Sequence, residues 1–226
     1  MAEIVAQNNE GITLATSIAQ KLREDVLSGH YSPGTRIRLE DIKSNFGVSW
    51  SPIREAITRL VTEGLIVSDS QKSYRVAPAS KSELIEAIEL RVQLETKALK
   101  LSIEKGDDAW EIDVVSAQHR LSKLESQKVS RNQAENWEEL HQGLHFALTK
   151  ACESPILLQF CHQLNDIQDR YRRIFFKLND FDRDVAHEHK LITDATLNRN
   201  AKLASKLLAD HIERTGRNIL AIMPHS

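Results

Sequence analysis

The sequence predicts a mostly α-helical protein, with an N-terminal domain of helices and one β-hairpin followed by a C-terminal all-α helical bundle. Apolar residues recur with helical spacing through most of the 226 residues. The last strand-like segments, 65–67 and 74–76, flank a polar stretch. Pro78-Ala79-Ser80 is the expected boundary, which gives domains at 10–78 and 79–226.

The composition is that of a soluble globular protein, with 41% hydrophobic and 27% charged residues. No apolar run approaches the roughly 18 residues of a membrane helix, and no signal peptide is evident, so a cytoplasmic protein without a membrane partner is expected. Cys152 and Cys161 form no metal-finger pattern and are interpreted as small buried hydrophobes. Residues 1–78 carry nine basic and nine acidic residues, so a nucleic-acid surface there needs its positive charge on one face.

The periodicity of the N-terminal domain predicts three helices, at 13–28, 39–45 and 51–63. The first has apolar residues at every fourth position, namely Leu14, Ile18, Leu22 and Val26. Gly29 ends this helix, and Gly64 ends the third. Gly47 lets the chain turn sharply between the second and third helices, and Ser49 can cap the third.

The third helix is two-sided. Its inner face is apolar and comprises Ile53, Ala56, Ile57, Leu60 and Val61. Its outer face carries Ser51, Arg54 and Thr58. Three helices followed by a β-hairpin are typical of a winged helix-turn-helix, whose third helix enters the major groove of DNA. Arg54 then suits the paired acceptors of guanine, although an arginine on an ordinary surface helix would simply be solvated.

The N-terminal motifs resemble those of the GntR family of bacterial repressors. They are LSGHYSPGTRI at 27–37, FGVSWSPIREAI at 46–57, RL at 59–60 and EGLI at 63–66. The resemblance implies contacts with double-stranded DNA through Arg36, Ser49, Trp50, Ser51, Pro52, Arg54, Arg59 and Lys72. It also implies a homodimer on a palindromic operator, and hence association with the nucleoid. The family usually has Arg where Trp50 stands and Gly where Ser73 stands, which leaves the operator sequence open.

The C-terminal domain is helical in period throughout. We expect helices near 81–104, 108–127, 131–153, 155–178, 182–198 and 201–222. Ser154 with Pro155 is a typical start signal, as is Asn200 for the last helix. Asp180 or Asp182 is expected to cap the helix before it.

Short motifs of this domain resemble the FCD-type sensor domain of the FadR branch of the GntR family, over residues 80–222. They are Glu89-Leu90-Arg91, Leu94-Glu95, Leu144-His145, Glu188-His189 and Asp210-His211-Ile212. The resemblance implies a small organic-acid effector and a bound metal. Release of DNA on effector binding is the usual mode of that family.

Four histidines lie on apolar stripes of three predicted helices: His141, His145, His189 and His211. Inward-facing histidines of a helical bundle can converge on a metal, although a single one is more often a hydrogen-bonded core residue. Imidazole ligands favour zinc, nickel, copper or iron, of which zinc or nickel is preferred here. Metal-binding FCD domains usually have Asp where His141 stands, and Glu138 could supply a carboxylate instead.

Two arginines are candidates for binding the effector. Arg91 lies in an apolar stripe, where an unpaired guanidinium is costly, and its partner is either Glu95 one turn later or an effector carboxylate. Arg172, at the edge of another stripe, is the second candidate.

Other functions fit less well. Glu138-x-x-His141 is half of a di-iron motif, which leaves a metal-dependent helical-bundle enzyme fused to a winged helix as the alternative. The sequence has no H-E-x-x-H, glycine-rich phosphate loop or G-x-S-x-G. A third hypothesis is a winged helix that serves only for protein interaction. A mobility shift of DNA by the protein would exclude it.

Overall fold

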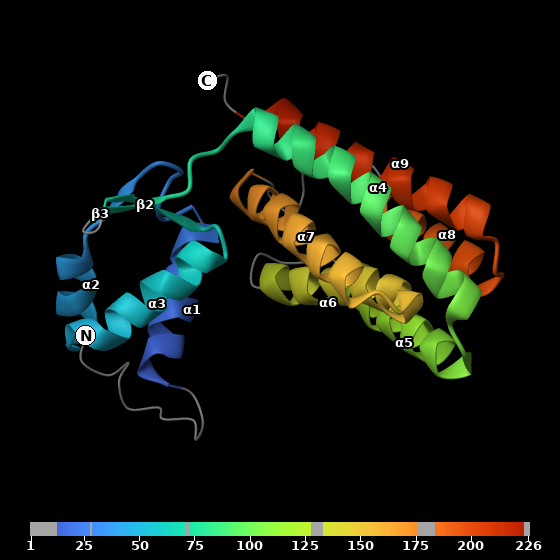
Figure 1. Cartoon of the computed structure of the whole chain (residues 1–226), viewed down its shortest axis with the longest axis horizontal. Coiled ribbons are helices and arrows are strands. Elements are labelled where there is room, and N and C mark those ends of the chain that lie inside the picture. Colours follow the sequence, from blue (N-terminus) through green and yellow to red (C-terminus); the bar gives the residue numbers. More distant parts are fainter. Residues whose placement is uncertain (1–12, 28, 71–72, 128–132, 176–183, 224–226) are drawn as a thin grey trace. The chain divides into compact units, whose positions relative to one another are not determined.

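The computed structural model describes residues 13–27, 29–70, 73–127, 133–175 and 184–223 (Figure 1). The chain forms two compact units, Met1–Ser80 and Lys81–Ser226. No helix in the described residues is both long and apolar enough to cross a membrane. Both cysteines are buried and unpaired, as predicted.

The N-terminal unit is a winged helix-turn-helix. Its elements are α1 (Leu14–Leu27), β1 (Arg36–Ile37), α2 (Leu39–Phe46), α3 (Trp50–Thr62), β2 (Ile66–Ser70) and β3 (Ser73–Val76). The predicted inner face of α3 forms the centre of the core, with Ile53, Ile57 and Leu60 fully buried. These side chains pack with the apolar face of α1, so that the opposite face of α3 remains in solvent. One stripe position was wrong, because Leu14 at the start of α1 is 46% exposed.

The predicted hairpin of β2 and β3 is confirmed, and it belongs to a three-stranded antiparallel sheet of order β1-β3-β2. The sequence reading missed β1, which has two residues and therefore no readable period. Its pairing with β3 is extended by the N–H of Val76, which donates to the carbonyl of Thr35 at 2.9 Å. This third strand ties the base of the wing to the segment before α2.

The turn between α2 and α3 depends on a left-handed residue. Gly47 has φ 63°, and its N–H donates to the carbonyl of Lys43 at 2.9 Å, as expected for the end of a helix. Ser49 occupies the N-cap of α3, but its side chain makes no capping hydrogen bond. The predicted position is therefore correct and the predicted bond is not.

The C-terminal unit is all-helical. Its elements are α4 (Lys81–Lys105), α5 (Asp108–Glu125), α6 (Ala134–Thr149), the 3₁₀ turn η3 (Lys150–Cys152), α7 (Pro155–Phe175), α8 (Val185–Leu197) and α9 (Ala201–Ile222). The long helix α4 packs along α9 and on α7, whereas α5 packs on α6 and α8 (Figure 1). The helix expected at 131–153 ends earlier, because η3 follows it and Glu153 is left-handed. This bundle brings α6, α8 and α9 around a common interior.

Helix caps fix where the last two helices begin. Asp184 caps α8 by accepting the N–H of His187 at 2.9 Å, and Asn200 caps α9 as predicted. The other expected caps, Asp180 and Asp182, lie outside the described residues. The helix predicted near 182–198 is present as α8, which begins at Val185.

A glycine sets the approach of α9 to α4. A Cβ added at Gly216 would lie 2.1 Å from Cδ1 of Ile88 and 2.6 Å from its Cγ1. We expect Gly216→Ala to lower the free energy of unfolding by about 1–3 kcal/mol, since overpacking outweighs the gain in helix propensity. Gly143→Ala in α6 is the matched control, because its Cβ meets nothing within 4 Å. Urea denaturation measures the free energy of unfolding of both variants. Equal stabilities would show that α4 and α9 can move apart at little cost to accommodate the added methyl group.

Candidate functional site

The outer face of α3 is free for a ligand. Ser51, Arg54 and Thr58 are exposed, opposite the buried core positions of the same helix. The side chain of Arg54 makes no ion pair or hydrogen bond with any described residue. Its guanidinium, with donors in a planar fork, is therefore available to acceptors outside the protein.

Other predicted DNA contacts have internal roles as well. Trp50 is 37% exposed, and Nζ of Lys43 lies 4.7 Å from its ring centroid, so this aromatic ring links α2 to the start of α3. Arg59 donates to Oγ1 of Thr16 at 2.9 Å and to Glu55 at 2.5 Å. The contact with Thr16 holds α3 on α1, and the contact with Glu55 lies within α3.

The remaining predicted DNA contacts differ in accessibility. Ser49 is exposed, and Pro52 is half-buried in the first turn of α3. Arg36 is exposed and lies opposite Arg75 across β1 and β3. Lys72 lies outside the described residues.

The C-terminal unit contains a buried cluster of four histidines. His141 and His145 come from α6, His189 from α8 and His211 from α9, and each is at most 5% exposed. One ring nitrogen of each histidine lies within 4.8 Å of those of the others. Spacing of this kind places all four imidazoles around one point, as a metal ion requires.

Three of these histidines have a carboxylate beside Nδ1. Glu188 lies 2.9 Å from Nδ1 of His211, and Glu125 lies 3.2 Å from Nδ1 of His189. Glu95 lies 3.4 Å from Nδ1 of His145. A carboxylate behind one nitrogen orients the ring and leaves the other nitrogen for a metal. The sequence reading missed Glu125, because no local pattern shows that the end of α5 meets α8.

The fourth histidine is held differently. The ring of His141 stacks on Trp137, with centroids 4.7 Å apart and planes 17° from parallel. Burial lowers the pKa of His141 well below its usual value, and the nearby charges of Arg172 and the other histidines lower it further. Burial also lowers the pKa of His145, although Glu95 opposes this shift. Neutral imidazole is the form that binds metals.

The cluster also leaves buried nitrogens without partners. Nδ1 of His141, both ring nitrogens of His145 and Nε2 of His189 have no hydrogen-bond partner among the described residues. Glu95 lies beside Nδ1 of His145 as an ion-pair contact only. Buried polar atoms are rarely left without a hydrogen-bond partner in folded proteins. A divalent transition metal would satisfy these nitrogens, and the donor set suits zinc or nickel.

Arg91 lies next to this cluster in the protein interior. Its Nε donates to Glu95 at 2.6 Å, and its Nη1 donates to Oε1 of Gln168. Burial raises the pKa of Glu95, but the charge of Arg91 and the contact with His145 prevail and lower it to about 2. The sequence-based partner Glu95 is therefore present. Nη2 of Arg91 nevertheless has no partner among the described residues.

Arg172 is occupied by two buried carboxylates. Its Nε donates to both oxygens of Glu138 at 3.1 Å, and its Nη2 donates to Asp169 at 2.5 Å. Burial opposes the charge of Arg172, but Asp169 and Glu138 outweigh it and raise its pKa. Glu138, His141 and Asp169 also lie close enough together for a metal, with Arg172 paired to both carboxylates. The sequence reading missed Asp169, although its spacing of three residues from Arg172 on one helix was visible.

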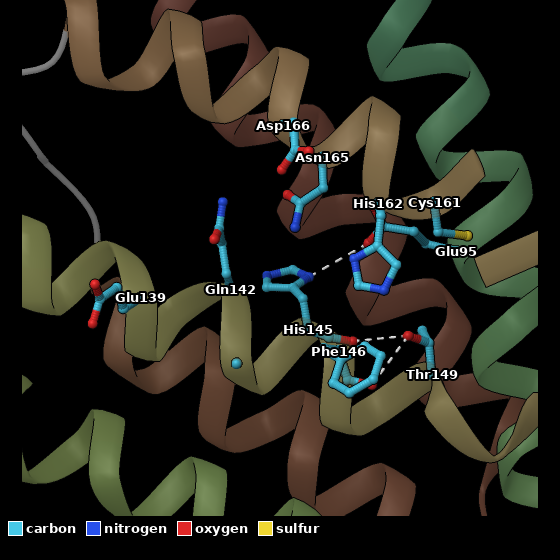
Figure 2. Close-up of a pocket in the computed structure, with 11 residues that line it drawn as sticks. Glu95, Glu139, Gln142, His145, Phe146, Thr149, Cys161, His162, Asn165 and Asp166 are labelled. Atoms are coloured by element: carbon cyan, nitrogen blue, oxygen red, sulfur yellow. Dashed lines mark hydrogen bonds and ion pairs between the residues drawn. The ribbon is translucent and has the colours of Figure 1, made fainter. Parts of the chain in front are cut away.

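A cavity of about 290 Å³ opens between α6 and α7, with Glu95 of α4 at its inner end (Figure 2). His145 lines this cavity and also belongs to the histidine cluster, so the two features adjoin. Cys161 lines it too, and burial raises the pKa of that thiol to about 12. Neither Arg91 nor Arg172 is among the lining residues.

Comparison with known proteins accounts for both units. Residues 14–76 match the family model "Bacterial regulatory proteins, gntR family", and residues 86–214 match "FCD domain". The chain is 34% identical over 195 residues to the HTH-type transcriptional repressor GlaR of Escherichia coli (strain K12), which covers 84% of this chain and 89% of that protein. The chain belongs to the GntR family.

Further similarities agree with this assignment. The regulator is 35% identical over 204 residues to the "Uncharacterized HTH-type transcriptional regulator BphR" of Paraburkholderia xenovorans (strain LB400), covering 89% of this chain and 83% of that protein. A crystal structure described as a putative GntR regulator from Rhodococcus sp. RHA1 has the same fold, with a TM-score of 0.73 and 19% identity over 93% of this chain and 99% of that chain. E. coli McbR/YncC gives a TM-score of 0.69 at 19% identity over 92% and 97% of the two chains.

The family settles the broad function. GntR regulators bind DNA and FCD domains bind small-molecule effectors, so this chain is a transcription regulator and not an enzyme. The alternative of a metal-dependent enzyme fused to a winged helix is thereby excluded. The combination of domains is consistent with the FadR-like branch. The recognition helix lies within the GntR match, and all four histidines lie within the FCD match.

Proposed function

We propose that this GntR regulator is a dimeric repressor whose operator affinity is controlled by a small organic acid bound beside a metal ion. The observation that carries the proposal is the cluster of His141, His145, His189 and His211, whose ring nitrogens lie around one point beside a buried arginine. Buried ring nitrogens of the first three have no partner among the described residues. These four residues would hold the metal. When bound, the metal supplies a Lewis-acidic position that a carboxylate oxygen can take.

Arg91 is the protein group best placed for the other end of that carboxylate. It is buried and positively charged, and its Nη2 has no partner among the described residues. Because Glu95 contacts both Arg91 and His145, the arginine and the histidine cluster are held in one network. Arg172 was a second candidate, but Glu138 and Asp169 already engage two of its nitrogens. We therefore assign the effector contact to Arg91.

Effector binding would add contacts between helices that already meet through side-chain packing and a few ion pairs. The histidines come from α6, α8 and α9, and Arg91 comes from α4. A ligand that contacts all four stabilises one arrangement of these helices and shifts the population toward it. In a homodimer on a palindromic operator, that shift changes the separation of the two recognition helices and releases the DNA.

The recognition face of α3 gives the test of DNA binding. Arg54→Ala is expected to weaken specific operator binding by about 1–3 kcal/mol, because it removes a fork-shaped donor for a guanine edge. The measurement is a fluorescence-anisotropy titration with the regulator's own promoter region at fixed salt.

The matched control for Arg54→Ala is Lys21→Ala. Lys21 is an exposed cation of α1 that pairs with Asp25 and lies off the outer face of α3. Lys21→Ala removes one positive charge, as Arg54→Ala does. Because Lys21 lies off the outer face of α3, its loss is expected to change operator affinity only slightly. Equal losses in both variants would mean that α3 contributes only general electrostatic attraction.

A further inference from the structure

The cavity between α6 and α7 is lined by acidic groups. Glu95, Glu139 and Asp166 line it, and no lysine or arginine is among the described residues that do so. Glu95 is engaged by Arg91. Glu139 and Asp166 are exposed near the mouth, and Asp166 also interacts with other groups of the protein. Figure 2 shows Glu139 on α6 and Asp166 on α7, on two sides of the opening. A second carboxylate of an effector would be repelled here.

A buried amide adds an unsatisfied acceptor to this cavity. Asn165 is 8% exposed, and its Oδ1 has no hydrogen-bond partner among the described residues. In Figure 2 the side chain of Asn165 lies between Asp166 and His145, with its amide oxygen on the side of Asp166 and its amide nitrogen toward His145 and Gln142. An unpartnered buried acceptor favours a ligand that brings a hydrogen-bond donor.

An aromatic surface completes the site. Phe146 is 43% exposed, and its ring lies 5.1 Å from the ring of His162, centroid to centroid. Both rings line the cavity. Carboxylates, an amide oxygen and aromatic faces are the groups that recognise organic ammonium ions. Neither Glu139 nor Asp166 belongs to a metal-sized cluster in the described chain, which favours an organic cation over a metal ion.

We propose that this cavity binds an ammonium group, and that the effector is therefore an amino-bearing carboxylic acid and not a simple dicarboxylate. The inference rests on the proposed function for the carboxylate end, which would lie at the metal and Arg91. His145 belongs to the histidine cluster and also lines the cavity, so one short molecule can reach from the metal position into the cavity. Binding of the ammonium group needs no metal. Ammonium binding in the cavity and carboxylate binding at the metal can therefore be tested separately.

The test uses three probes of equal chain length on the full-length protein, with and without zinc. The probes are butylammonium, butanoate and 4-aminobutanoate. Their binding is measured by ligand-observed NMR and by calorimetry. Butylammonium is expected to bind in preference to butanoate in the zinc-free protein, and its affinity should not change when zinc is added. 4-Aminobutanoate is expected to bind more tightly than either, and only its affinity and that of butanoate should rise with zinc.

Paired variants locate the site. Glu139→Gln with Asp166→Asn should weaken butylammonium by about tenfold, the value typical of losing hydrogen bonds to charged groups. Glu104→Gln, an exposed carboxyl of α4 outside the cavity, should leave its affinity unchanged. The inference is overturned if butanoate binds the zinc-free protein as well as butylammonium does, if neither amine binds, or if the paired variant binds the amine normally. Absence of any zinc effect would instead contradict the metal role in the proposed function.

Discussion

His189→Ala is expected to abolish retention of the metal and with it the stabilisation that the metal provides. His189 is 1% exposed, and its Nε2 has no protein partner among the described residues. A ligand that binds only the folded form at a concentration 100 times its dissociation constant stabilises it by about 2.7 kcal/mol. Elemental analysis and thermal unfolding with and without added zinc measure the two effects. Zinc should raise the melting temperature of the wild type and leave that of the variant unchanged.

The same helix offers the control. His187 is exposed, two residues before His189 on α8, and only its backbone N–H takes part in the cap at Asp184. His187→Ala should keep both the metal and the zinc-dependent rise in melting temperature. Full occupancy in the His189 variant would place the metal elsewhere. A wild type that binds no zinc even after reconstitution would leave the four histidines as core residues or direct effector contacts.

Arg172→Met is expected to lower the free energy of unfolding by about 3–5 kcal/mol, because it leaves Glu138 and Asp169 buried without their counter-charge. The control is Arg217→Met, since Arg217 is 64% exposed and pairs only at the surface. A surface pair of that kind contributes at most about 1 kcal/mol. Chemical denaturation at fixed pH compares the two.

The loss in the Arg172 variant should depend on pH. Burial already raises the pKa of Glu138, and Arg172 opposes that rise. A carboxyl group whose pKa is higher in the folded state than its unfolded value of about 4.3 destabilises the protein as pH rises through the folded value. The difference in stability between wild type and Arg172→Met should therefore be larger at pH 8 than at pH 5. A pH-independent difference would indicate lost packing without a buried charge.

A compensating variant separates charge from packing. Adding Glu138→Gln to Arg172→Met removes one of the two carboxylates that the arginine neutralises. The double variant should recover part of the stability if unpaired charge is the cause, and none if the cause is lost volume.

The features that could be predicted from the sequence are those that depend on residue spacing within a single helix. The apolar stripe that carries Arg91 and the stripes that carry the four histidines repeat every three or four residues, and the structure buries all five side chains. The ion pair of Arg91 with Glu95 spans one turn and was readable for the same reason. The order of three helices and a hairpin predicted the N-terminal fold, and the sharp turn expected at Gly47 is present as a left-handed residue.

What could not be predicted depends on contacts between distant segments. Glu125 meets His189 across 64 residues, and Gln168 meets Arg91 across 77. No period along one helix reveals which carboxyl group or amide another helix will present. The acidic character of the cavity was missed for this reason too, since Glu139 and Asp166 belong to different helices. Strand β1 was not predicted, because its two residues form a strand only through their pairing with β3.

Glu95 has a consequence for how the cell's metal supply would act on this regulator. Its carboxylate touches Arg91 and His145 and also lines the cavity, so it contacts the residues that we propose for the metal and for both ends of the effector. Binding free energies linked in this way are reciprocal, and the factor by which zinc tightens the effector equals the factor by which the effector tightens zinc. A cell short of metal would then need more effector for the same release of DNA, and a cell rich in effector would retain the metal.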